Sequence, residues 1–215
     1  MIPIRVFFQK IGEARFISHL DLNRFMLRAI KRTGLPVWHT EGFNPHVYVT
    51  FATPLSLGQT SKYEIMDLRL TQEMELDQVK KAFDRVMPPT LPVLAVAYPV
   101  KNPKEIAFAR YEIRMKDCVD RYASIAALFD QKEMPVMKTT KKGADKVINL
   151  KEEMQEVTLG TDNQDVKICL RLPAGTMKNI NPALLVQYVR GKLEEYLPCD
   201  IVRTAVLDQE LQLFH

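Results

Sequence analysis

The spacing of apolar and polar positions predicts strands and helices that alternate along the chain, in an order that occurs twice. The first half reads βαββαβ, with strands at 2–8, 46–52, 62–70 and 92–99 and helices at 18–33 and 75–87. The second half adds strands at 108–115, 134–139, 146–159, 165–172 and 200–207 and helices at 119–130 and 182–196. The second half therefore has the pattern of the first with extra strand.

A break in the pattern separates the two halves. Residues 100–108 include Asn102 and Pro103 and follow neither the helical nor the strand period, which is typical of a linker. We therefore predict an α+β fold of two tandem ferredoxin-like (split βαβ) units with antiparallel sheets, in domains at 1–100 and 101–215. The alternative is a single α+β domain with one continuous sheet.

Composition indicates a globular chain and gives no sign of a membrane segment, a metal or a cofactor. The 215 residues are 47% hydrophobic and 26% charged. No apolar run reaches the roughly 18 residues that cross a bilayer, and the N-terminus does not look like a secretory signal. We therefore expect a cytoplasmic protein. The cysteines Cys118, Cys169 and Cys199 are widely spaced in apolar surroundings, so we expect them to be reduced and without metal.

The net charge of +4 lies entirely in the N-terminal quarter. Residues 1–60 carry seven Lys or Arg against three acids, and the remaining residues carry 23 of each sign. An anionic partner is therefore expected to bind the N-terminal quarter.

The predicted helix at 18–33 carries much of this charge. Ser18 is suited to cap its first turn, where Asp21 favours the helix dipole, and Gly34 is suited to end it. Opposite the apolar face lies a basic stripe, made of Arg24, Arg28, Lys31 and Arg32. The sequence places no acid among them. The stripe is either an ordinary solvated face or a surface whose counter-charge is supplied by phosphates.

The segment after this helix concentrates aromatic and hydrogen-bonding side chains around a turn at Gly42 and Pro45. Its candidate RNA-binding residues are Trp38, His39, Phe43, Asn44 and His46. These side chains suit a loop that stacks and reads bases, and they equally suit a structural corner in which Asn44 and His46 bind backbone groups. The spacing of His19, His39 and His46 matches no metal-ligand signature.

The same N-terminal stretch resembles a family of uncharacterised bacterial domains. The motifs that carry the resemblance are RFISHLDL, GLP after the helix, EGFNPH and TPLSLG, within the first 70 residues. Members of that family occur as free proteins or fused to radical S-adenosylmethionine (radical SAM) proteins, and often near ribonuclease E/G-type enzymes in the genome. The resemblance therefore implies RNA biology, with a radical SAM protein or a ribonuclease E/G-type enzyme as a partner. It implies no catalytic residue.

Catalytic signatures are missing from the sequence. It contains no Walker loop, GxGxxG, GxSxG or HExxH motif, and no CxxxCxxC for a radical SAM cluster. On one helix His19 and Asp21 point about 200° apart, so they do not face one substrate together. We therefore predict a non-catalytic RNA-associated module that binds RNA or presents it to a partner enzyme. The alternatives are a metal-free ribonuclease or RNA-modification subunit, and a protein-interaction domain of a radical SAM system.

A second basic segment lies in the C-terminal half. Residues 138–146, KTTKKGADK, form a basic tip around Gly143. The segment is either a hairpin turn or a second phosphate contact.

Overall fold

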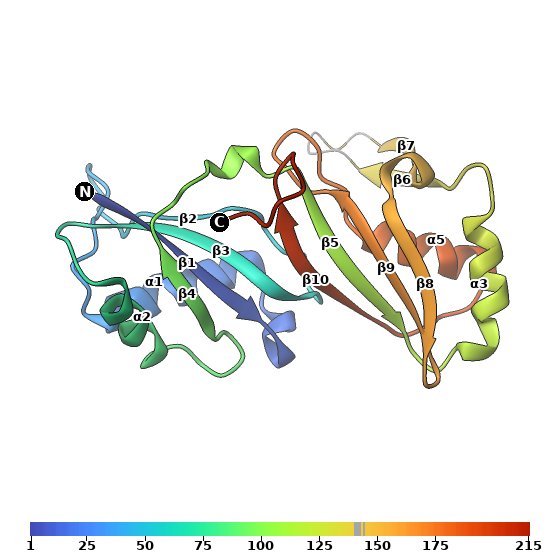
Figure 1. Cartoon of the computed structure of the whole chain (residues 1–215), viewed down its shortest axis with the longest axis horizontal. Helices are drawn as coiled ribbons and strands as arrows, with labels where there is room; N and C mark the ends of the chain where they lie inside the picture. Colours follow the sequence, from blue (N-terminus) through green and yellow to red (C-terminus); the bar gives the residue numbers. More distant parts are fainter. Residues whose placement is uncertain (140–142, 144) are drawn as a thin grey trace. The chain divides into compact units, whose positions relative to one another are not determined.

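The structure is a computed structural model that describes residues 1–139, 143 and 145–215. Its contacts divide the chain into two compact units (Figure 1). Unit 1 comprises Met1–Ile106 together with Asp208–His215, and unit 2 comprises Ala107–Leu207. The C-terminal residues therefore belong with the N-terminal half, whereas the sequence analysis grouped them with the second half. The division into domains at 1–100 and 101–215 stays a prediction.

Unit 1 combines an antiparallel sheet with two helices. Its elements are β1 (Ile2–Lys10), α1 (His19–Thr33), β2 (Val49–Phe51), β3 (Thr60–Leu70), α2 (Leu76–Asp84) and β4 (Val93–Ala97), with short 3-10 helices at Gly12–Phe16 and Pro103–Glu105. Strand β1 pairs with β4 on one side and β3 on the other, and β2 pairs with β3. The strand order is therefore β4-β1-β3-β2.

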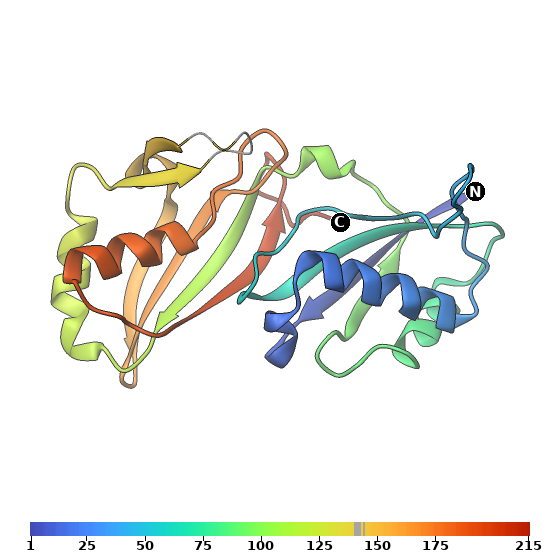
Figure 2. The same cartoon turned by 180° about the vertical axis from the view of Figure 1, so that it is seen from behind.

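The two faces of this sheet have different roles. Alternate residues of β1, such as Ile4, Val6 and Phe8, lie in one buried cluster with residues of α1 and α2, including Met26 and Phe83. This is the pattern expected when successive side chains of a strand point to opposite faces. Figure 2 shows α1 lying across this face. The opposite face, which we call the open face, carries the residues between these core positions.

Helix α1 begins and ends as the sequence predicts. The Ser18 hydroxyl accepts a hydrogen bond from the Asp21 amide at 3.1 Å, and Gly34 ends the helix with a φ of 73°. That left-handed conformation strains a residue with a Cβ atom, so glycine suits the position. The predicted amphipathic face is buried against the sheet.

Unit 2 repeats the strand order of unit 1 with an insertion. Its elements are β5 (Phe108–Met115), α3 (Tyr122–Phe129), β6 (Pro135–Thr139), β7 (Asp145–Asn149), α4 (Leu150–Glu153), β8 (Gln155–Asp162), β9 (Asp165–Pro173), α5 (Ala183–Leu193) and β10 (Cys199–Leu207), with a 3-10 helix at Val119–Arg121. Its main sheet has the order β10-β5-β9-β8, with antiparallel pairs. Strands β6 and β7 form a separate hairpin. The expected mixture of helices and antiparallel strands is confirmed.

One predicted strand differs from the structure, and part of a second predicted segment lies outside the described residues. The strand expected at 146–159 is two strands, β7 and β8, separated by the short helix α4. Four positions of the basic tip expected at 138–146, residues 140–142 and 144, lie outside the described residues. Among the described residues, no helix is long and apolar enough to span a membrane.

Candidate nucleic-acid interface

The basic stripe of α1 is exposed, but one of its four members is paired. Arg24 donates to Asp21, with 3.2 Å between Nη1 and Oδ1, so the stripe has one acidic partner, which precedes it in the sequence. The acid lies at position i−3 of the same helix, where side chains are neighbours. The three remaining members, Arg28, Lys31 and Arg32, are exposed and have no ion pair within the described part of the chain.

The carboxylate of Asp21 is engaged at the start of the helix. The Ser18 hydroxyl donates to Asp21 Oδ2 at 2.7 Å, and this hydrogen bond, followed by that from Arg24, lowers the pKa of the carboxyl. The ring of His19 instead lies edge-on to that of Phe51, at 5.2 Å between centroids. His19 and Asp21 thus have different partners, which agrees with the expectation that they do not act as a pair.

The segment after α1 forms an irregular hairpin at residues 37–48. Val37 bridges to Leu70 of β3, and the Trp38 amide donates to the Arg69 carbonyl at 2.8 Å. The two arms of the hairpin join each other between His39 and Val47. This pairing explains why regular strand begins only at Val49 rather than at the predicted residue 46. The hairpin extends the pairing at this edge of β3 from Leu68, where the β2 pairing ends, to Leu70.

The two histidines of the hairpin lie against its own backbone. His46 Nδ1 lies 3.0 Å from Thr40 Oγ1 and 3.1 Å from the Asn44 carbonyl, and the His46 amide donates to Thr40 Oγ1 at 3.2 Å. His39 Nδ1 lies 3.2 Å from the Val37 carbonyl. For the histidines the structure supports the structural-corner interpretation. Among the described residues no group of three or more His, Cys, Asp or Glu side chains could hold a metal ion.

The tip of the hairpin projects its side chains into solvent. Phe43 is fully exposed, and Asn44 is exposed and has no side-chain hydrogen bond within the described part of the chain. A large aromatic side chain in water is costly unless a partner covers it. Phe43 and Asn44 are therefore the hairpin residues best placed to contact a ligand.

This difference between the histidine and the asparagine leads to a stability prediction. We expect His46→Ala to lower the free energy of unfolding by about 0.5–1 kcal/mol and to speed amide exchange in the hairpin, because its hydrogen bonds are lost. Asn44→Ala should change the free energy of unfolding by less than about 0.5 kcal/mol, because the Asn44 side chain contacts solvent. Urea denaturation and hydrogen exchange of both variants test this. Equal effects of the two substitutions would contradict the assignment.

Trp38 stacks with a cation that the sequence analysis did not single out. The Arg69 guanidinium lies 5.3 Å from the Trp38 ring centroid and 4.6 Å from that of Tyr48, and the two rings lie 5.5 Å apart. Such cation–π contacts hold a guanidinium in place without neutralising it. The three residues come from both arms of the hairpin and from β3. Only pairing of the hairpin with β3 brings them together.

A groove of about 450 Å³ lies beside this cluster, on the open face of unit 1. Tyr48, Thr50 and Arg69 line it, together with Arg5, Asp67, Lys101 and Lys104. Four cations thus surround a single carboxylate. This site was not predictable from the sequence, because Arg5, Arg69 and the two lysines come from distant parts of the chain and belong to no stripe or motif.

The floor of the groove is a buried ion pair. Arg5 is fully buried and binds Asp67 through two parallel hydrogen bonds, at 2.7 Å from Nε to Oδ1 and 2.8 Å from Nη2 to Oδ2. Its Nη1 donates to the carbonyl of His215 at 3.1 Å, and its guanidinium lies 4.8 Å from the ring of Phe214. The C-terminal segment therefore completes the surroundings of Arg5.

Two further residues of unit 1 form polar contacts with this C-terminal segment. The Tyr63 hydroxyl donates to the Phe214 carbonyl at 3.0 Å, and burial raises the pKa of Tyr63 to about 12. Lys101 forms an ion pair with the buried Asp208, and the hydrogen bond between them raises the pKa of Lys101 and lowers that of Asp208. Both lysine and aspartate are therefore charged at neutral pH.

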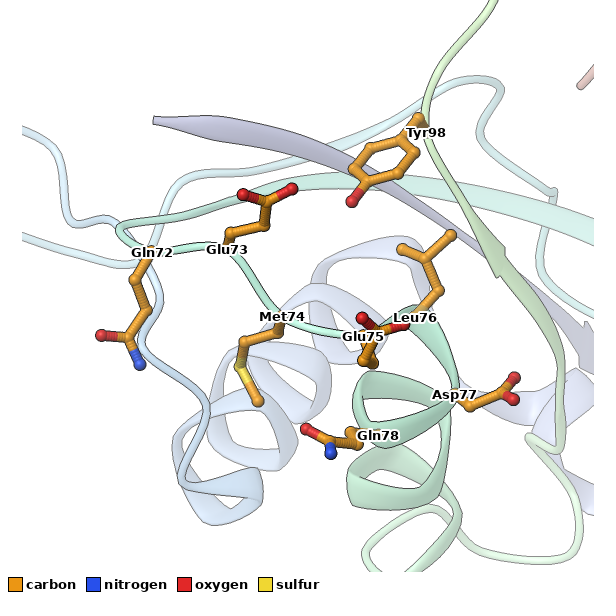
Figure 3. Close-up of a pocket in the computed structure, with 8 residues that line it drawn as sticks. All are labelled: Gln72, Glu73, Met74, Glu75, Leu76, Asp77, Gln78 and Tyr98. Carbon is orange, nitrogen blue, oxygen red and sulfur yellow. The ribbon is translucent and has the colours of Figure 1, made fainter.

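Another pocket of unit 1 has the opposite charge. Figure 3 shows it at the start of α2, where Glu73, Glu75 and Asp77 lie on one segment and Tyr98 comes from the segment after β4. Within the described part of the chain, its lining includes no lysine or arginine. Three carboxylates repel phosphate, so this pocket is not part of a nucleic-acid interface.

A comparison with protein families identifies the family of the chain. Residues 3–182 match the model of a family described as "Uncharacterized protein conserved in bacteria (DUF2344)". The chain therefore belongs to the DUF2344 family. No curated protein matches it in sequence.

Two solved structures align with most of this DUF2344 chain. A chain in the "Crystal Structure of a Cbf5-Nop10-Gar1 Complex" aligns with 94% of it at 9% identity and a TM-score of 0.49, and the DUF2344 chain spans 48% of that chain. The chain in the "Crystal Structure of an Unknown Protein from Galdieria sulphuraria" aligns over 98% of its own length with 94% of the DUF2344 chain, at 10% identity and a TM-score of 0.27. Both TM-scores lie below 0.5, so neither similarity bears on function.

Proposed function

We propose that this DUF2344 protein is a non-catalytic RNA-associated module, which binds RNA or presents it to a partner enzyme. The observation that carries the proposal is the exposed set Arg28, Lys31 and Arg32, whose charges no acid balances among the described residues. Residues at i, i+3 and i+4 share one helix face, so the three cations can follow one phosphate backbone.

The hairpin tip supplies the second part of the proposed interface. Figure 2 shows the chain leaving α1 and running directly into the segment that forms the hairpin, at the same end of unit 1. Phe43 offers an exposed ring on which a base can stack, and Asn44 offers an amide that can bind a base edge. We propose that RNA contacts the last two turns of α1 and this tip.

The salt dependence of RNA binding tests the proposal. Each lost phosphate contact on a single strand should reduce the slope of log affinity against log salt by about 0.7, so changing Arg28, Lys31 and Arg32 to Gln should flatten it by up to about 2 units. The fold should persist, because exposed substitutions change stability by less than about 0.5 kcal/mol each. Titration of labelled single-stranded RNA at several salt concentrations measures the slope.

Arg24→Gln is the matched control. Arg24 lies on the same stripe but is already paired with Asp21, so its loss should change the slope by less than any of the other three. A folded triple variant with the wild-type slope would refute the proposal. The basic stripe would then be a solvated face, and the protein-interaction alternative would take its place.

We further propose that both units are ferredoxin-like, so that the fold is a tandem of split βαβ units. The strand order β4-β1-β3-β2 in unit 1 and β10-β5-β9-β8 in unit 2 supports this, because the two orders are equivalent once β6, β7 and α4 are set aside. A cytoplasmic location, and a radical SAM protein or a ribonuclease E/G-type enzyme as partner, remain proposals that rest on the sequence.

A further inference from the structure

The groove on the open face of unit 1 has the charge and the size of a binding site for a small anion. Its lining includes four cations, Arg5, Arg69, Lys101 and Lys104, and one carboxylate, Asp67. Even after the pairing of Lys101 with Asp208, the positive charges remain in excess. The volume of about 450 Å³ lies within the range of small-molecule pockets.

Two of these cations have donors available for a ligand. Arg69 lies against the rings of both Trp38 and Tyr48, and its side chain has no hydrogen bond or ion pair within the described part of the chain. Lys104 is exposed and likewise has no ion pair there. A guanidinium fixed by stacking can bind phosphate through two parallel hydrogen bonds with little loss of side-chain freedom.

Arg5 and Asp67 contribute in a different way. Arg5 directs Nε and Nη2 to Asp67 and Nη1 to the His215 carbonyl, so its donors are occupied and Asp67 balances its charge; the excess positive charge of the groove comes from Arg69 and Lys104. Asp67 is 18% exposed in its side chain, and a carboxylate has acceptor capacity beyond the two bonds that it receives from Arg5. It can therefore accept from a hydroxyl group of a ligand.

We infer that this groove binds one nucleotide, whose phosphate contacts Arg69 and Lys104 and whose ribose hydroxyl donates to Asp67. A nucleotide carries both the anion and the hydroxyl donors that the lining complements, whereas inorganic phosphate at neutral pH supplies mainly the anion. The same chemistry occurs in a free nucleoside monophosphate and in the phosphorylated end of an RNA strand. The basic stripe of α1 is not part of this site, so the inference does not depend on the proposed function.

Calorimetric titration of the full chain tests the inference with AMP, adenosine and inorganic phosphate as probes. We expect saturable binding of AMP, with adenosine and phosphate each at least about tenfold weaker, because each lacks one set of charge-assisted contacts. Trp38 is the only tryptophan and lies against Arg69, so its fluorescence should change on AMP binding. Absence of saturable AMP binding, or equal binding of adenosine, would overturn the inference.

Substitutions assign the binding to the groove. Arg69→Gln should weaken AMP binding by about tenfold or more, and Lys104→Gln, which is exposed and safe for the fold, should weaken it several-fold. Lys81→Gln is the control, because that cation is exposed on α2, outside the groove, and its loss should leave AMP binding unchanged. If Arg69→Gln and Lys104→Gln bind AMP like the wild type, or if Lys81→Gln causes the same loss, the groove is not the site.

Two RNA probes separate the sources of the nucleotide. An oligonucleotide with a 5′-phosphate that binds more tightly than its 5′-hydroxyl form, with the difference lost in Arg69→Gln, supports an RNA end as the ligand. Equal binding of the two forms, with AMP binding retained, supports a free nucleotide. A wild-type salt slope in the folded triple variant of α1 would refute only the proposed function. Absence of AMP binding would refute only this inference.

Discussion

Asp67→Ala is expected to lower the free energy of unfolding by about 3 kcal/mol, because it leaves the buried guanidinium of Arg5 without its carboxylate. Arg5 is fully buried, and two of its three polar contacts go to Asp67. The remaining contact, to the carbonyl of His215, does not neutralise the charge. Because Asp67 is 18% exposed, water can reach the site, so we expect the low end of the range for broken buried pairs.

Two controls separate a buried charge from a general loss of contacts. Replacing both partners, as in Arg5→Met with Asp67→Leu, should cost less than Asp67→Ala alone, because no unpaired charge remains. Lys80→Ala removes a pair with Asp84 whose side chains are 35% and 44% exposed, so it should cost less than about 0.5 kcal/mol. Chemical denaturation gives all three values. A cost below about 1 kcal/mol for Asp67→Ala would show that water stabilises Arg5 on its own.

Phe83→Ala is expected to lower the free energy of unfolding of unit 1 by about 3–5 kcal/mol. The Phe83 side chain is completely buried in the cluster that joins α1, α2 and the sheet. Its removal leaves a cavity within this cluster, which also contains Met26 and Phe8. The fluorescence of Trp38, which lies in unit 1, follows the unfolding of this unit during denaturation.

The matched change in unit 2 tests whether the units are independent domains. Ile168 is completely buried in the cluster of unit 2, and Ile168→Ala should cost about 2–5 kcal/mol there. If residues 1–100 fold as predicted, this variant should leave the Trp38 transition in place and shift only part of the circular dichroism transition. A Trp38 transition that moves equally in both variants would contradict independent folding.

Local chemistry explains why much of the secondary structure was predictable. Helix α1 runs from His19 to Thr33, as expected, because its cap at Ser18 and its end at Gly34 depend on residues within a few positions. The strands of both halves were predicted because a sheet with one buried face imposes a period of two on its sequence. The segment at 146–159 was harder, since a four-residue helix such as α4 leaves too short a pattern to distinguish from strand.

The candidate site was predictable only in part, because its side chains fall into two kinds. Arg28, Lys31 and Arg32 share one helix, so their common face follows from helical spacing alone. His39 and His46 were candidates by residue type, but the structure directs both rings to backbone groups of the hairpin. Which side chain of a loop binds backbone groups depends on the path of the backbone, and residue type does not determine that path.

The sequence by itself determined the order of elements, the amphipathic helix with its basic stripe, the concentration of charge in the N-terminal quarter and the membership of the DUF2344 family. Only the tertiary structure decided that Arg69 stacks on Trp38 and Tyr48, and that Arg5, Asp67 and Lys104 share one groove. The physical reason is the separation along the chain over which each interaction acts. Capping and periodicity act over a few residues, whereas strand pairing joins positions as distant as Arg5 and Asp67.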